Sequence, residues 1–144
     1  MICHLLGNGP SRSSFTHEPK GDVFGCNFSD ETLSLKATFI TDATVFEHLT
    51  RTKQKLPWPI ICPDRFRKDC QRLVLPVHDT FDRICKLGES TGHHAAIWLQ
   101  DNGYREIHLW GFDSLKTATA WSDTNDKIPK AIWSDGNVPR WRKF

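Results

Sequence analysis

Four polar segments of this 144-residue chain carry residue types that bind phosphates, ribose hydroxyls or base edges. Each follows a short run rich in apolar or β-branched residues, the pattern of a strand that ends in a polar loop. The four are Gly7-Asn8-Gly9-Pro10-Ser11, Cys26-Asn27, Thr41-Asp42 and Gly111-Phe112-Asp113. Because ligands of open parallel sheets collect beyond the carboxyl ends of the strands, these segments predict one ligand site at that edge.

The glycine-rich segment has two interpretations. Glycines let backbone N–H groups approach an anion, and a following helix offers unpaired N–H groups, so Gly7 and Gly9 could hold a phosphate. The same glycines could make only a tight turn from strand to helix. Asn8 and Asn27 also have two interpretations. An amide side chain can form hydrogen bonds with a ribose or a base edge, or with its own backbone in a turn. Asp113 could accept from a ribose or cap a turn.

A helix start at Ser90-Thr91-Gly92-His93-His94 is the second group with chemical potential. Thr91 could bind a phosphate oxygen, cap its helix, or do both. The helix dipole lowers the basicity of His93 and His94, so either could contact phosphate or act as a base. Adjacent helical residues point in different directions, and at least one of the pair is expected to face solvent or core instead. Asp42 is the third candidate base, and no set of metal ligands can be named.

The elements that must position these residues alternate between strand and helix. Apolar runs predict strands over 2–6, 22–27, 37–42, 60–62 and 105–111, and 3.6-residue spacing with caps predicts helices over 42–51, 63–70 and 91–102. The segment 73–77 is extended but ambiguous, and Arg65, Arg67 and Lys68 are assigned to a solvated helix face. We therefore predict a single α/β domain over 1–144, a Rossmann-like, doubly wound, mostly parallel sheet whose last segment, 113–144, is irregular.

The composition excludes several classes of protein. Lys and Arg total 19 against 17 Asp and Glu, so the formal charge of +2 makes nucleic acid an improbable partner. The five cysteines never fall as C-x-x-C, which argues against a zinc ribbon or a thioredoxin-like site and favours a reducing cytoplasm. No apolar run reaches the length that spans a bilayer. The basic tail Arg140-Trp141-Arg142-Lys143 is a solvated terminus, a phosphate clamp or a nucleic-acid contact.

Three segments, in the same order, resemble the nucleotide-binding half of bacterial sialyltransferases of the Campylobacter type and the related pterin-diphosphokinase-like family. They are GNGPS at 7–11, DVFGCN at 22–27 and STGHHAAIWLQDNGYREIHLWGFD at 90–113. The resemblance implies a Rossmann-like fold that binds a cytidine nucleotide. It places Asn27 facing the nucleotide and Asp113 near the ribose or base. By the same match, phosphate, ribose or sugar would lie near Gly7, Asn8, Gly9, Ser11, Ser90, Thr91 and Gly92.

The chain also departs from that family. The sialyltransferases are much longer and carry a lid with phosphate-binding tyrosines and a histidine that deprotonates the acceptor, whereas Tyr104 is the only tyrosine here and no histidine follows His108. We therefore expect a small protein that binds a nucleotide or nucleotide-derived molecule without catalysis and without a cofactor, and that captures a signal as virus-encoded sponge proteins do. The competing hypothesis is a minimal glycosyltransferase or phosphotransferase that uses His93, His94 or Asp42 as base. A homodimer is expected to complete the site.

Overall fold

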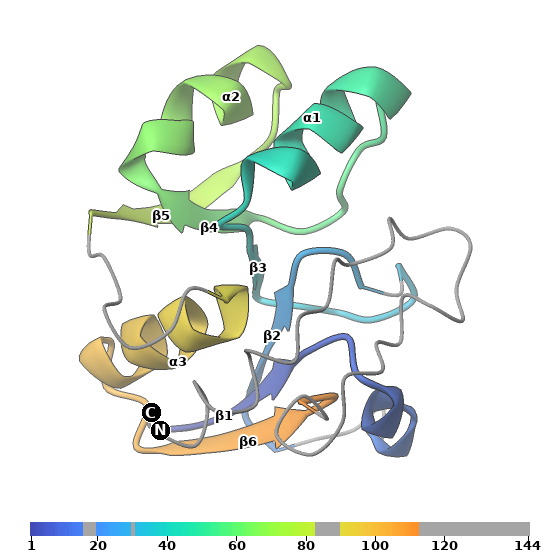
Figure 1. The fold of residues 1–144 in the computed structure, drawn as a ribbon. Helices are drawn as coiled ribbons and strands as arrows, with labels where there is room; N and C mark the ends of the chain where they lie inside the picture. The colour runs from blue at the N-terminus through green and yellow to red at the C-terminus, as the bar shows by residue number, and fades with distance from the viewer. Residues whose placement is uncertain (16–19, 30, 83–89, 113–144) are drawn as a thin grey trace.

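The computed structural model describes residues 1–15, 20–29, 31–82 and 90–112, and Figure 1 shows their path. The predicted irregular segment 113–144 lies outside the described residues, together with Asp113 and the basic tail. The side chain of Ser11 lies outside them too. The structure therefore tests the strand-and-helix predictions up to Phe112.

Six parallel strands form one sheet in the order β5-β4-β3-β2-β1-β6 (Figure 1). Every neighbouring pair in the described sheet is parallel. The strands are β1 (Ile2–Leu6), β2 (Asp22–Cys26), β3 (Ala37–Phe39), β4 (Ile60–Pro63), β5 (Val77–Phe81) and β6 (Glu106–Trp110). The prediction of a Rossmann-like α/β fold with a parallel sheet is confirmed.

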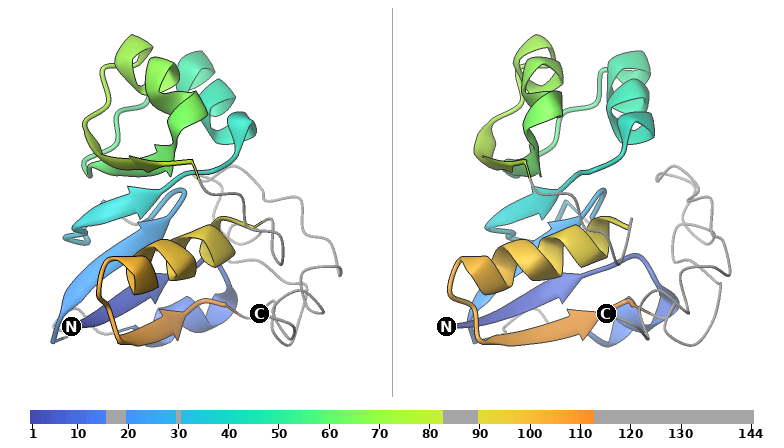
Figure 2. Two further views of the ribbon diagram at one scale, coloured as in Figure 1. Left: turned by 90° about the vertical axis from the view of Figure 1, so that its left-hand side faces the viewer. Right: turned by 60° about the vertical axis from the view of Figure 1, so that its left-hand side comes forward.

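Three α-helices and two short 3-10 turns connect the strands. The helices are α1 (Ala43–Thr52), α2 (Arg67–Arg72) and α3 (Thr91–Asp101), and the 3-10 turns are η1 (Pro10–Ser14) and η2 (Asp64–Phe66). Figure 2 shows α1 and α2 next to each other, away from α3. All three predicted helices are present, with boundaries shifted by a few residues.

The two faces of the sheet carry two separate hydrophobic clusters. Successive strand residues point to opposite faces, so neighbours in one strand join different clusters. Ile60 and Cys62 of β4 pack in the cluster that contains α1 and α2, whereas Ile61 packs in the cluster that contains α3. Leu6 and Leu5 of β1 divide in the same way. Burial on both faces explains why these strands are continuous apolar runs rather than alternating ones.

The strand order reverses once. From β1 to β5 each new strand is added on the same side, and the chain then returns along α3 to place β6 on the other side of β1. Because parallel crossovers are right-handed, a reversal of direction moves the connecting helix to the opposite face, where α3 is found. The carboxyl ends of β1 and β6 therefore meet at the reversal point of the sheet.

Two predicted boundaries are wrong. The ambiguous extended segment 73–77 is mostly a turn after α2, and the strand there, β5, runs from Val77 to Phe81. Leu75 is apolar because it is buried, not because it belongs to a strand. The strand predicted over 37–42 ends at Phe39. Thr41 and Asp42 instead lead into α1 at the carboxyl edge of the sheet.

Candidate functional site

The loop after β1 is locked to the end of β6 by its backbone. The Gly7 and Gly9 N–H groups donate to the carbonyls of Trp110 (2.7 Å) and Gly111 (2.6 Å). A Cβ atom on Gly7 would lie 2.7 Å from the Gly111 oxygen, and Gly111 itself has φ +74°. The glycines thus permit two backbones to touch at the reversal point. A phosphate near this loop would have to use donors other than these two N–H groups.

Asn8 and Asn27 follow the ends of β1 and β2. The Asn8 amide nitrogen donates to the Cys26 carbonyl at 3.3 Å, which ties the ends of the two strands together. Asn27 has φ 58°, in the left-handed region, and its N–H donates to the Phe39 carbonyl at 2.7 Å. Its side-chain oxygen is buried and has no hydrogen-bond partner in the described part of the chain. Asn27 therefore adopts a turn conformation and keeps an unused acceptor.

Two threonines and an aspartate connect β3 to the start of α3. The hydroxyl of Thr91 donates to the Asp42 carboxylate at 3.3 Å, and the Thr41 hydroxyl lies 2.8 Å from that of Thr91. Thr91 has a single hydroxyl proton, which goes to Asp42, so Thr41 must donate to Thr91. Thr41 and Thr91 are each 5% exposed, while Asp42 is exposed to solvent. This relay of hydrogen bonds from Thr41 through Thr91 to Asp42 leaves the Asp42 carboxylate accessible to solvent.

The start of α3 corrects the prediction that Thr91 caps this helix. Ser90 occupies the N-cap position, and its side chain makes no capping hydrogen bond. Its hydroxyl lies 2.5 Å from Nδ1 of His93, which is fully buried. The His93 and His94 N–H groups donate to the Ser90 carbonyl at 3.1 and 3.4 Å, whereas those of Thr91 and Gly92, at the first two positions of the helix, stay available to an anion.

His94 lies on the other side of the helix start and is half-buried. Its ring stacks on Phe81 at a centroid distance of 5.8 Å. Burial lowers the pKa of His94 below its ordinary value of 6.5, the positive charge of Arg65 lowers it further, and Asp42 acts in the opposite direction. The imidazole is therefore neutral at pH 7.

Arg65 completes this group of residues. It comes from η2, directly after β4, and its guanidinium donates to the Thr41 carbonyl at 3.2 Å while lying 4.7 Å from the centre of the Phe66 ring. Arg65, Arg67 and Lys68 are all exposed, as their assignment to a solvated face predicts, but that assignment did not include this contact of Arg65. The signal was available, because Asp64 and Arg65 follow the predicted strand 60–62 at the carboxyl edge. We call Thr41, Asp42, Arg65, Thr91 and His94 the β3–α3 site.

The structure thus brings together some of the predicted site residues and separates others. Asp42, Thr91 and His94 meet, with Ser90 and Gly92 beside them in the chain. His93 points into the core. Gly7, Asn8, Gly9 and Asn27 lie at the ends of β1 and β2, and no hydrogen bond among the described residues joins them to the β3–α3 site. The Ser11 side chain and Asp113 lie outside the described residues.

No group of three His, Cys, Asp or Glu side chains in the described residues is arranged to hold a metal ion. Within those same residues, no helix has the length and apolar character to cross a bilayer. No protein-family model, curated protein or solved structure matches the chain.

Proposed function

We propose that this protein binds a nucleotide or a nucleotide-derived small molecule at the β3–α3 site and holds it without turnover. The observation that carries the proposal is the meeting of an uncapped helix start with Asp42 and Arg65 at the carboxyl edge of a parallel sheet. Open α/β sheets place their ligands at this edge.

The mixture of charges favours a nucleotide over a simple anion. The start of α3 and the Arg65 guanidinium attract phosphate oxygens. Asp42 repels a bare phosphate, but its carboxylate accepts hydrogen bonds from hydroxyl groups such as those of a ribose. A nucleotide carries both kinds of group, so one ligand can satisfy both ends of the site.

The positions of the three candidate bases favour binding without turnover. His93 is fully buried with Nδ1 facing Ser90, and the exposed Asp42 carboxylate is the group that this proposal assigns to the ribose hydroxyls. His94 has no hydroxyl or thiol as a hydrogen-bond partner in the described residues, so no activated nucleophile stands beside it. Ligand binding alone therefore accounts for the arrangement of these side chains, whereas a transfer reaction would need further catalytic groups.

A minimal glycosyltransferase or phosphotransferase is the second candidate, and one observation favours it. The lowered pKa of His94 keeps its imidazole neutral and able to take a proton from an acceptor hydroxyl. In that case turnover would fall as pH drops and His94 becomes protonated, and His94→Gln would abolish it.

The test is the recovery of ligand from the purified chain. The protein is incubated with nucleoside mono-, di- and triphosphates, cyclic nucleotides and nucleotide sugars, filtered, heat-denatured, and the released molecules are identified by mass spectrometry. We expect one intact nucleotide. Product at many equivalents per protein would establish the transferase, and release of no nucleotide would refute both candidates.

A pair of arginine variants locates the ligand. Arg65→Gln should weaken binding about tenfold, because it removes a charged donor to phosphate. Arg72→Gln is the matched control. Arg72 lies in the last turn of α2 and contacts Thr50 and Asp69, away from the carboxyl edge. Equal affinities for the two variants would show that the ligand binds elsewhere.

A further inference from the structure

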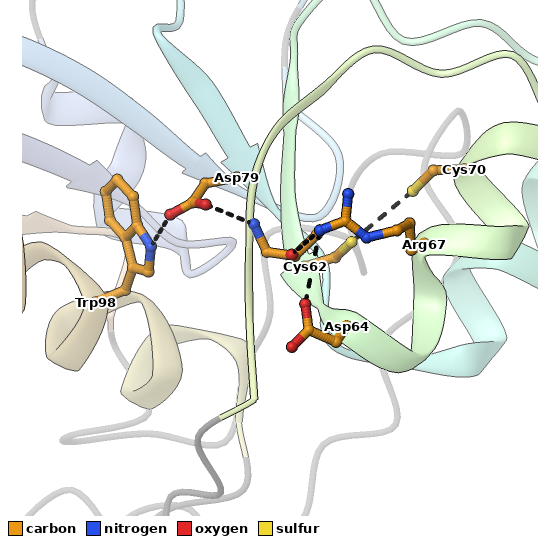
Figure 3. Close-up of polar contacts among 7 residues, drawn as sticks. Cys62, Asp64, Arg67, Cys70, Asp79 and Trp98 are labelled. Carbon is orange, nitrogen blue, oxygen red and sulfur yellow. Dashed lines mark hydrogen bonds and ion pairs between the residues drawn. The ribbon is translucent and has the colours of Figure 1, made fainter.

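Two cysteines from different elements lie side by side in the core. Cys62 is in β4 and Cys70 is in α2, and their sulfur atoms are 3.8 Å apart (Figure 3). Both side chains are fully buried. A disulfide needs the sulfurs about 2 Å closer, at about 2.05 Å. A small movement would therefore bring the two sulfur atoms to bonding distance, without a rearrangement of the fold.

The two thiols differ in their electrostatic surroundings. The hydrogen bond between them raises the pKa of Cys62 and lowers that of Cys70, with burial opposing the second effect. Arg67, in the first turn of α2, favours the thiolate form of both groups and pairs with Asp64 at 3.8 Å (Figure 3). Cys70 thus carries the greater thiolate character, and Cys62 is the proton-bearing partner.

A structural zinc site does not account for the pair. Such sites take four ligands, and no third His, Cys, Asp or Glu of the described residues forms a cluster with these two sulfurs. Two adjacent thiols without further ligands are instead suited to a reaction with each other.

We propose that Cys62 and Cys70 form an oxidation site at which a hydroperoxide produces an intramolecular disulfide between β4 and α2. This inference is independent of the ligand proposed above. It adds a covalent modification to a chain whose cysteine spacing shows no C-x-x-C motif.

The reaction proceeds in two balanced steps. The Cys70 thiolate attacks a peroxide oxygen, the O–O bond breaks, and the leaving oxygen takes up the proton that Cys70 had released, which gives a sulfenic acid and an alcohol or water. The Cys62 sulfur then attacks the sulfenic sulfur, and the displaced hydroxide leaves as water with the Cys62 proton. Two thiols lose two electrons in total, and one hydroperoxide gains them.

Access for the oxidant depends on α2. This helix has six residues, and the turn that follows it contains Val74, which has φ 54° and is 77% exposed. A β-branched residue in the left-handed region is strained, which favours local opening at this end of the helix. Because opening precedes oxidation, the rate should level off at high peroxide concentration.

Peptide mapping of the full chain tests the proposal. The reduced protein is treated with hydrogen peroxide, denatured in N-ethylmaleimide and digested with trypsin, which separates the two cysteines by cleaving at Arg65, Arg67 and Lys68. We expect a linked pair of peptides, 56–65 and 69–72, that is lighter by two hydrogens and is released by dithiothreitol. Cys3 and Cys26, which are also buried, serve as internal controls and should remain alkylated.

Single variants separate the two roles. Cys62→Ser should let Cys70 accumulate as a sulfenic acid that dimedone traps, whereas Cys70→Ser should leave Cys62 unreactive. Cys3→Ser should not alter the linked pair. The proposal is overturned if the wild-type chain gives no 62–70 link at a peroxide dose that oxidises Cys3 or Cys26, or if the link forms no faster than links among other cysteines.

Discussion

The hydroxyl of Thr91 holds two chain segments together at the β3–α3 site. It donates to Asp42 and lies within hydrogen-bond distance of the Thr41 hydroxyl. Removing it takes this partner from the buried Thr41 hydroxyl. Thr91→Val should therefore lower the free energy of unfolding by about 1–2 kcal/mol in urea titrations.

A matched variant supplies the control for that effect. Thr44 is exposed in the first turn of α1, so Thr44→Val should change the free energy of unfolding by less than about 0.5 kcal/mol. Thr91→Ser, which keeps the hydroxyl, should recover much of the loss. A Thr91→Val protein as stable as the Thr44→Val protein would show that the relay contributes nothing to folding.

Position 7 requires glycine because another backbone segment lies directly against it. A Cβ atom there would lie 2.7 Å from the Gly111 oxygen, which cannot rotate away as a side chain can. Gly7→Ala should lower the free energy of unfolding by about 2–3 kcal/mol. Gly103→Ala should cost less in the same denaturation assay, because its nearest atom, in the Met1 side chain, is 3.6 Å away and only its φ of +86° is unfavourable. The reverse ranking would contradict this account.

His94 should make stability depend on pH. Its pKa is lower in the folded chain than the ordinary value of 6.5, so the unfolded chain binds more protons between these two values. The contribution of His94 is complete above 6.5 and decreases as pH falls towards the folded pKa. Urea titrations at several pH values should show a smaller loss of stability in acid for His94→Gln than for the wild type. Identical pH profiles would refute the assignment.

At the scale of secondary structure, a triad joins three elements at the amino edge of the sheet. The Asp22 carboxylate at the start of β2 accepts from Lys36 (2.7 Å) and from the Tyr104 hydroxyl (2.5 Å), and Tyr104 precedes β6. These two bonds lower the pKa of Asp22. Tyr104→Phe should reduce the free energy of unfolding by about 1 kcal/mol.

A double-mutant cycle tests whether that triad acts as a unit. Asp22→Ala combined with Tyr104→Phe should cost less than the sum of the single changes, because each single change already removes the shared hydrogen bond. Additive losses in urea titrations would show that the two residues contribute separately.

Most helices and strands could be predicted from the sequence because burial on both faces leaves a clear apolar signal. The exceptions have physical reasons. β5 is an edge strand whose first three residues are exposed, so it has no apolar run. The buried Leu75, which precedes β5, instead gives segment 73–77 the apolar character expected of a strand. The predicted strand 37–42 extends past β3 because Ile40, although outside the strand, is buried and its N–H still donates to the Ile61 carbonyl at 3.0 Å.

At the scale of the whole molecule, the parallel α/β architecture followed from the alternation of elements, but the strand order did not. Which strand pairs with which is decided by contacts between distant segments, such as β1 with β6. The same limit applies to the site. The sequence predicted a common edge for the polar loops, yet only the folded chain shows that Arg65 donates to the Thr41 carbonyl there, while Gly7 and Gly9 donate to the carbonyls of Trp110 and Gly111.

The position of β1 between β2 and β6 has a consequence for biosynthesis. β1 ends at Leu6 and β6 begins only at Glu106, so β1 leaves the ribosome well before the strand it pairs with. At translation rates of about 5–20 residues per second, the edge of β1 that pairs with β6 remains without hydrogen bonds for roughly 5–20 s. During that time the nascent chain exposes an apolar strand edge to other chains. Chaperone demand during synthesis should therefore end when β6 emerges.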